Sequence, residues 1–328
     1  MIEANGLTKS YGTTLAVNDL SFTVSPGRVT GFLGPNGAGK STTMRMMLGL
    51  DRPNTGDVRI DGKRYAELTH PLHTVGALLD AKWMHPNRSA RAHLRWLARS
   101  NKISAKRVDE VLGLVGLTEV AGKRAGGYSL GMSQRLGIAA ALLGDPQVLL
   151  FDEPVNGLDP EGIAWIRTFM QSLAAQGRTV FVSSHLLSEM AITASELVVI
   201  GRGRLITQCT TADFVENATQ STVRVRTPQT ARLRAVLAGP GRTVTEEDGG
   251  LLVIGLTSQE VGELAAAHGL VLHELSPQRG SLEQAFIQMT GQDVEFHGLT
   301  SLPAENQRQA MEVMAGTSQR PNQGVAQP

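Results

Sequence analysis

The sequence predicts an α/β protein with a largely parallel core sheet, followed by a smaller α+β unit. Three observations predict this architecture. Short apolar runs typical of buried strands alternate with helical patterns over the first two thirds of the chain. A glycine-rich turn joins one such strand directly to a helix near residue 40. Beyond residue 219, shorter strand and helix patterns begin again and the charge balance turns from basic to acidic.

The length of 328 residues allows one large domain and a smaller one. We expect the first domain over residues 1–215, with a helical insert at about 81–137. We expect a small accessory domain over residues 220–292. Residues 293–328 are polar, and we expect them to form a disordered tail.

Composition excludes several classes of protein. The net charge is only +1 and aromatic residues make up 4% of the chain, so we expect no nucleic-acid partner. The single cysteine, Cys209, cannot form an internal disulfide, which is typical of a reducing compartment. The sequence contains no secretory signal and no run of eighteen apolar residues. Any action at a membrane is therefore expected to depend on a partner.

The first residues alternate as half-exposed strands at 2–7 and 20–24. The Pro26-Gly27 turn then leads into a short strand at 28–33. After the first helix we expect a further strand pair that begins at residues 57–60, with Asp61-Gly62 as its turn.

The central stretch fits G-x-x-x-x-G-K-[ST] and lies between a strand and a helix. Glycines allow the loop to point successive backbone N–H groups at a phosphate chain, and the following helix adds its positive end. Lys40 is expected to reach the terminal phosphates and Ser41 to offer its hydroxyl to Mg²⁺. The stretch consists of Gly34, Pro35, Asn36, Gly37, Ala38, Gly39, Lys40, Ser41 and Thr42.

Residues 89–117 show helical periodicity without any strand-like run. No Asp or Glu occurs between Lys82 and Val108, and Arg91, Arg95 and Arg99 lie one turn apart on one face. Two interpretations stay open. The basic face is either a solvated helix surface or a docking surface for an acidic partner segment or anionic headgroups.

Two carboxylates follow the apolar run at 148–151, namely Asp152 and Glu153. Such a strand places them at the carboxyl edge of a parallel sheet, where these sheets bind ligands. Asp152 is expected to hold Mg²⁺, and Glu153 to orient and polarise the water that attacks the γ-phosphate. A helix at 160–175, a strand at 179–182, a helix after His185 and a strand at 196–200 should follow. His185 is expected at the same sheet edge.

A second predicted phosphate-binding site precedes the apolar strand at 148–151. Ser129 and Gly131 open an apolar helix, so a hydroxyl, a bare backbone N–H and a helix dipole converge on one anion site.

The unit after residue 219 shows a strand at 222–226, a helix around 233–237 and two strands that flank Asp248. Capping-box spacing, Thr257 with Glu260 and Ser281 with Gln284, marks two more helix starts. The unit carries no cluster that suggests chemistry. We expect a structural or partner-contacting module.

The order of these motifs over residues 1–213 resembles the ATP-binding cassette (ABC) ATPases, which are P-loop NTPases with an antiparallel β subdomain and a helical insert. In that family Tyr11 matches the aromatic residue that stacks on adenine, and Gly34 to Thr42 match Walker A. Residues 148–152 match Walker B. The resemblance also implies that Glu153 is the catalytic carboxylate, that Asp159 forms the D-loop, and that His185 contacts the γ-phosphate.

Two motifs depart from the family pattern. Leu130 and Met132 replace the first Gly and the Gln of the usual Leu-Ser-Gly-Gly-Gln signature, whereas Ser129 and Gly131 are kept. Asp80 stands where the family has Gln and some exporters have Glu, so the resemblance makes it a third candidate Mg²⁺ ligand beside Ser41 and Asp152.

The Tyr-Ser-x-Gly-Met-x-Gln-Arg pattern at 128–135, together with a C-terminal unit that ends in Ser-Leu-Glu-Gln-Ala-Phe at 281–286, is similar to the daunorubicin- and bacitracin-type exporter ATPases. That resemblance implies ATP hydrolysis that drives export of drugs, antibiotics or lipid-like compounds. It also implies a head-to-tail dimer and a separately encoded membrane permease that holds the protein at the cytoplasmic face of the membrane. The alternatives are a non-transport ABC ATPase acting on ribosomes or nucleic acid, and a phosphoryl-transfer kinase.

Overall fold

The computed structural model describes residues 1–80, 84–218, 222–247 and 249–278. The expected tail at 293–328 and the second capping box at Ser281 and Gln284 lie outside the described residues, as do Lys82 and Asp248.

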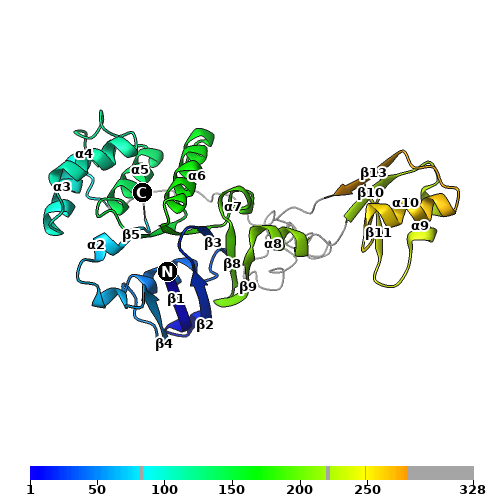
Figure 1. The fold of residues 1–328 in the computed structure, drawn as a ribbon, viewed down its shortest axis with the longest axis horizontal. Helices are drawn as coiled ribbons and strands as arrows, with labels where there is room; N and C mark the ends of the chain where they lie inside the picture. The colour runs from blue at the N-terminus through cyan, green and yellow to red at the C-terminus, as the bar shows by residue number, and fades with distance from the viewer. Residues whose placement is uncertain (81–83, 219–221, 248, 279–328) are drawn as a thin grey trace, which may run out of the picture. The chain divides into compact units, whose positions relative to one another are not determined.

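A six-stranded sheet with the order β5-β6-β7-β3-β8-β9 forms the core of the first domain. Figure 1 labels its strands β5, β3, β8 and β9. Neighbouring strands run parallel from β5 to β8, and β9 alone pairs antiparallel with β8. The predicted, mainly parallel α/β fold is confirmed. The strands are β3 (Val29–Leu33), β5 (Val75–Leu78), β6 (Val148–Asp152), β7 (Thr179–Ser184), β8 (Glu196–Gly201) and β9 (Arg204–Thr210).

Apolar layers cover both faces of this sheet, because its strands carry apolar side chains in both directions. On one face, Val180 and Val182 pack in a core with helices α5, α6 and α7. On the other face, Phe181 packs in a core with α1 and the antiparallel sheet. The covering helices are α1 (Lys40–Met47), α5 (Leu130–Ala141), α6 (Pro160–Ala175) and α7 (Leu187–Thr193).

A three-stranded antiparallel sheet with the order β2-β1-β4 lies beside α1. The expectation of a strand pair after α1 is wrong. β4 pairs with β1, as in Ile2 opposite Ile60, and after the Asp61-Gly62 turn only an isolated bridge joins Ile60 to Lys63. β1 is long enough to pair with β4 over several residues, whereas the segment after the Asp61-Gly62 turn forms only that one bridge. The strands are β1 (Ile2–Tyr11), β2 (Thr14–Val24) and β4 (Thr55–Ile60), followed by the 3-10 turn η1 (Tyr65–Glu67).

The predicted helical insert contains α3 (Ala90–Ser100) and α4 (Ala105–Leu114), which pack beside α5 (Figure 1). Ser89 and Ser104 cap the two helices with their hydroxyl oxygens. Several short elements were not expected from the sequence. They are α2 (Pro71–Thr74), η2 (Ala125–Gly127) and α8 (Thr211–Ala218), together with strands β5 and β9.

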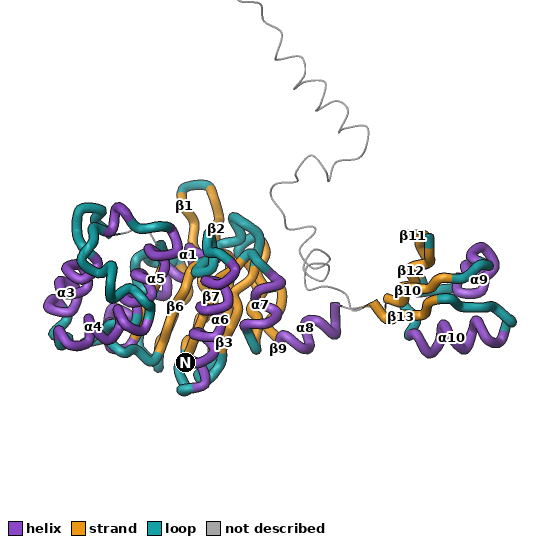
Figure 2. The backbone as a smooth tube through the Cα atoms, turned by 90° about the horizontal axis from the view of Figure 1, so that it is seen from above, coloured by secondary structure: helices purple, strands orange, loops and turns teal. Residues whose placement is uncertain are grey.

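A four-stranded antiparallel sheet with the order β11-β12-β10-β13 forms the predicted small α+β unit (Figure 2). Val225 and Val253 of the sheet pack against Leu233 of α9 and Val261 of α10. The Thr257–Glu260 capping box is present at the start of α10. The elements are β10 (Thr222–Arg226), α9 (Thr230–Leu237), β11 (Thr243–Glu247), β12 (Gly250–Ile254), α10 (Ser258–Ala267) and β13 (Glu274–Gln278).

Within the described ranges, every helix is too short or too polar to cross a bilayer.

Candidate functional site

The glycine-rich loop connects the end of β3 to the start of α1, and two of its glycines have no room for a side chain. A Cβ on Gly34 would lie 2.7 Å from the carbonyl oxygen of Ile200. Gly39 has a φ of 99°, and a Cβ there would lie 2.5 Å from the carbonyl oxygen of Ala16. The loop therefore needs glycine both for its backbone conformation and for its contact with neighbouring strands.

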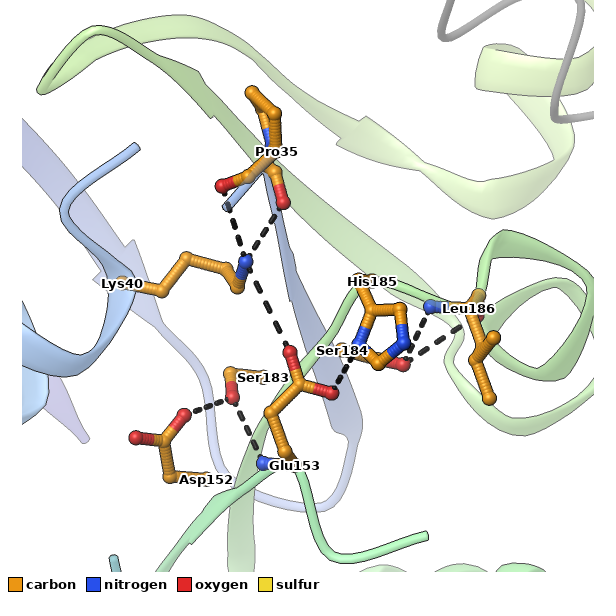
Figure 3. A network of polar contacts seen from close by, with 9 residues as sticks. Pro35, Lys40, Asp152, Glu153, Ser183, Ser184, His185 and Leu186 are labelled. Atoms are coloured by element: carbon orange, nitrogen blue, oxygen red, sulfur yellow. Dashed lines mark hydrogen bonds and ion pairs between the residues drawn. The ribbon is translucent and has the colours of Figure 1, made fainter. Parts of the chain in front are cut away.

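Lys40 is the first residue of α1, and its side chain is only 7% exposed. Its Nζ atom donates to the carbonyl oxygens of Gly34 at 2.7 Å and Pro35 at 3.3 Å, and lies 3.8 Å from Oε1 of Glu153 (Figure 3). Burial lowers the pKa of Lys40, and the carboxylates of Glu153 and Asp152 oppose that shift. The loop thus holds a buried cation beside the carboxylates.

Glu153 joins this cation to His185. Its Oε2 atom lies 2.6 Å from Nδ1 of His185, which directly follows β7 (Figure 3). Glu153 has a positive φ of 48°, an uncommon conformation for a residue other than glycine. Lys40, Glu153 and His185, which come from three separate segments, therefore form one chain of contacts at the carboxyl edge of the sheet.

Ser183 links the two carboxylate residues from the neighbouring strand. It is fully buried in β7, opposite Asp152 of β6 in the parallel register. Its hydroxyl donates to Oδ1 of Asp152 and accepts from the backbone N–H of Glu153 at 3.0 Å. Sequence reasoning did not include Ser183 in the site. The register of β6 and β7, which it did not use, was the missing signal.

A cavity of about 240 Å³ opens between the glycine-rich loop and Glu153. Its lining consists of Ala16, residues 35–42 and Glu153, so it includes the glycine-rich loop, Lys40 and one carboxylate. A glycine-rich loop followed by a lysine is suited to an anion of the size of a phosphate chain.

The side chains around this cavity can supply only part of a cation's ligand shell. Among the described residues, no three His, Cys, Asp or Glu side chains are grouped to hold a metal ion. Ser41 is exposed beside the loop, and Asp152 is half-buried at the end of β6. Leu78, the last residue of β5, is opposite Phe151 of β6. Asp80 comes two residues after β5, so it lies past the same edge of the sheet as Asp152. This set fits Mg²⁺, which keeps waters and phosphate oxygens in its shell.

Tyr11 lies at the end of β1 and is 46% exposed. Its hydroxyl donates to Oδ2 of Asp51 at 2.5 Å, and the ammonium of Lys9 lies 5.0 Å from the ring centroid. Sequence reasoning did not mark Asp51, whose place depends on the turn after α1.

The second predicted anion site begins α5. Ser129 is the N-cap residue, and its Oγ accepts from the backbone N–H of Met132 at 3.2 Å. Asp159 caps α6 in the same way, accepting from Gly162 at 2.9 Å. The lining residues of the 240 Å³ cavity come from other parts of the chain, so within the described structure Ser129, Gly131 and Asp159 do not face it.

Comparisons with known proteins agree with this geometry. Residues 17–156 match the family model described as ABC transporter, and residues 221–283 match a model described as Domain of unknown function (DUF8746). The uncharacterized ABC transporter ATP-binding protein YhcH of Bacillus subtilis (strain 168) is 38% identical over 90% of this chain and 97% of its own length. The bacitracin transport ATP-binding protein BcrA of Enterococcus faecalis is 36% identical over 89% of this chain and 96% of its own length.

Solved structures show the same fold. An ATP-binding subunit of an ABC transporter has a TM-score of 0.61 at 26% identity, covering 66% of this chain and 92% of its own. A dimeric bacterial ABC transporter cassette has a TM-score of 0.59 at 23% identity, covering 64% of this chain and 99% of its own. The chain therefore belongs to the family of ABC transporter ATP-binding proteins, which are nucleotide-binding ATPases.

Proposed function

We propose that this protein hydrolyses ATP with Mg²⁺ at the cavity beside Lys40 and couples hydrolysis to transport through a separate membrane subunit. The observation that carries the proposal is the continuous contact chain from Lys40 through Glu153 to His185 beside the cavity lined by the glycine-rich loop.

In this proposal Lys40 exchanges its contacts with the loop carbonyls for the terminal phosphates of ATP. Ser41 and Asp152 hold Mg²⁺, with Asp80 close to the same edge. Bound Mg²⁺ supplies neutralisation of the charge that develops on the phosphate oxygens. Glu153 orients and polarises the attacking water, and His185 holds the Glu153 carboxylate and meets the γ-phosphate.

A second copy of the chain completes each site. Ser129 and Gly131 begin a helix whose N-terminal end suits an anion, yet they do not line the cavity of their own chain in the described structure. In a head-to-tail dimer with two-fold symmetry, these two residues of one copy close over the nucleotide bound to the other. Tyr11 stacks on the adenine, and Asp159 lies at the dimer contact.

Mixing two inactive variants tests this arrangement. Lys40→Ala and Ser129→Ala should each lose most ATPase activity. In a mixed dimer one site carries both defects while the other is intact, so an equal mixture should regain up to about a quarter of the wild-type rate. Catalysis within single subunits predicts no recovery. A rate per molecule that stays constant on dilution, with Ser129→Ala still active, would contradict the dimer.

The cargo class follows from the relatives. Proteins at 36% and 34% identity are named for bacitracin and lantibiotic transport. We propose that this chain drives export of a drug, antibiotic or lipid-like compound from the cytoplasmic face of the membrane, held there by its permease. Affinity isolation from native membranes should recover an integral membrane protein. Recovery of ribosomal RNA or DNA in its place would favour the ribosome- or nucleic-acid-directed alternative.

A further inference from the structure

The turn after α1 brings Asp51 back towards the start of the chain. The backbone N–H groups of Leu50 and Asp51 donate to the carbonyl oxygen of Arg45, which closes this turn. The Asp51 carboxylate then accepts from two side chains at once. Oδ2 receives the Tyr11 hydroxyl at 2.5 Å and Nε of Arg45 at 2.7 Å. Asp51 thus connects the end of β1 to the helix that follows the phosphate loop.

The Tyr11 ring is restrained at a second point. The ammonium of Lys9 lies 5.0 Å from the ring centroid and donates to the carbonyl oxygen of Arg52 at 2.7 Å, which keeps the cation in place. The ring is nonetheless 46% exposed. It therefore retains surface on which a flat ligand can stack, while its hydroxyl and one cationic contact are fixed.

Charge keeps this connection intact at neutral pH. The hydrogen bond from Arg45 lowers the pKa of Asp51 to about 2, so the carboxylate stays ionised. The hydrogen bond to Asp51 raises the pKa of Tyr11, so the phenol stays protonated and remains a donor. A donor and an ionised acceptor form one of the stronger kinds of hydrogen bond.

We propose that Asp51 is the positioning residue for the Tyr11 ring and thereby sets how tightly the protein holds the base of its nucleotide. This inference rests on the proposed function, in which Tyr11 stacks on adenine. A ring held in its stacking orientation before the ligand arrives loses less conformational freedom on binding, so the ligand binds more tightly. The effect should concern the base alone, because the phosphates meet the loop and Lys40.

Calorimetric titration of the full-length protein with ATP and with inorganic tripolyphosphate separates the two parts of the ligand. Asp51→Ala should raise the Kd for ATP about three- to tenfold, the net scale of one ordinary hydrogen bond, because the pair lies near the surface. Its Kd for tripolyphosphate should stay within about twofold of wild type. Tyr11→Phe, which keeps the ring and removes the hydroxyl, should show the same pattern. Combining both changes should add little to either, because each breaks the same bond.

Asp57→Ala is the matched control. Asp57 is also an aspartate paired with an arginine, Arg59, at 3.0 Å, but the Tyr11 hydroxyl donates to Asp51. This control should leave both Kd values within about twofold. Equal weakening of ATP and tripolyphosphate in Asp51→Ala would overturn the inference, because the residue would then act on the phosphate loop through Arg45. Unchanged ATP affinity in Asp51→Ala and Tyr11→Phe would also overturn it.

Lys40→Ala in the same assay distinguishes this inference from the proposed function. It should abolish or greatly weaken binding of both ligands. If it does so while the Asp51 and Tyr11 variants bind ATP normally, only the positioning role of Asp51 fails. If Lys40→Ala binds both ligands as wild type does, the proposed site itself is wrong.

Discussion

The two sheets that dominate the described structure organise polar residues differently. In the six-stranded sheet, Asp152, Glu153, Ser183 and His185 meet at one edge, beside a buried lysine. In the four-stranded sheet of β10 to β13, Arg226 pairs with Glu274 at 3.3 Å, and Ser276 donates to the same carboxylate.

The difference follows from strand direction. Neighbouring strands β6, β7 and β3 run parallel, so residues at their carboxyl ends lie side by side, as Asp152 lies opposite Ser183. Neighbours among β10 to β13 run antiparallel, so their carboxyl ends alternate between opposite edges. Parallel topology concentrates reactive groups, and antiparallel topology here builds a core and a polar surface.

The largest expected effect tests whether a carboxylate in either sheet contributes equally to ATP hydrolysis. Glu153→Gln should lower ATP turnover by about two to four orders of magnitude, the usual contribution of a general base, while ATP still binds. Glu274→Gln, the same change in the antiparallel sheet, should stay within about twofold. Steady-state hydrolysis and nucleotide titration measure both. A Glu153→Gln protein with most of its turnover would remove Glu153 from the proposed role.

The next effect concerns stability, and here the larger change is expected in the four-stranded sheet. Leu251 of β12 is 1% exposed in the small core, whereas Leu252 points to the opposite face and is half-buried. Leu251→Ala should cost about 2 to 5 kcal/mol of unfolding free energy in that unit, and Leu252→Ala clearly less. Hydrogen exchange of β10 and β12 amides measures the difference. Equal protection in the two variants would show that the core is not where the described packing puts it.

A smaller effect is expected from Ser183→Ala. Removing the donor to Asp152 should raise the Mg²⁺ concentration for half-maximal ATP hydrolysis about tenfold, because a hydrogen bond to a charged group contributes about 1.5 kcal/mol or more. Ser276→Ala is the matched control, since Ser276 donates to Glu274 at 2.9 Å in the antiparallel sheet. It should leave the Mg²⁺ dependence unchanged. The same shift in both variants would point to a general loss of stability.

The smallest effect concerns how the free energy of unfolding depends on pH. The pKa of Asp51 is lowered to about 2 from its usual 3.8, so its pairing stabilises the fold fully above about pH 4 and is lost as the pH falls towards 2. The pair lies near the surface, so we expect at most about 1 kcal/mol. Urea unfolding of wild type and Asp51→Asn should differ at neutral pH and converge as the pH approaches about 2. A difference that grows on acidification would contradict the assignment.

Local patterns predicted much of this molecule. The helix at Pro160–Ala175 has the predicted bounds, and the strand before the phosphate loop differs by one residue. These elements have strong local signals, namely an N-cap aspartate before proline and a short, largely apolar run between the Pro26-Gly27 turn and the glycine-rich loop. The strand β5 has only four residues, which is too short for a clear sequence pattern. The pairing of β4 was decided by the long strand β1 and not by the turn that follows β4.

The sequence by itself determined which residue types could bind phosphate, Mg²⁺ and water, because those chemistries depend on short motifs within one strand, loop or helix. Only the tertiary structure decided that Lys40 meets Glu153, that Ser183 joins two carboxylate residues and that Asp51 holds Tyr11. Each of these contacts joins segments that are separate in the chain. Strand order and the packing of α1 bring such segments together, and no periodicity within a few residues encodes that order.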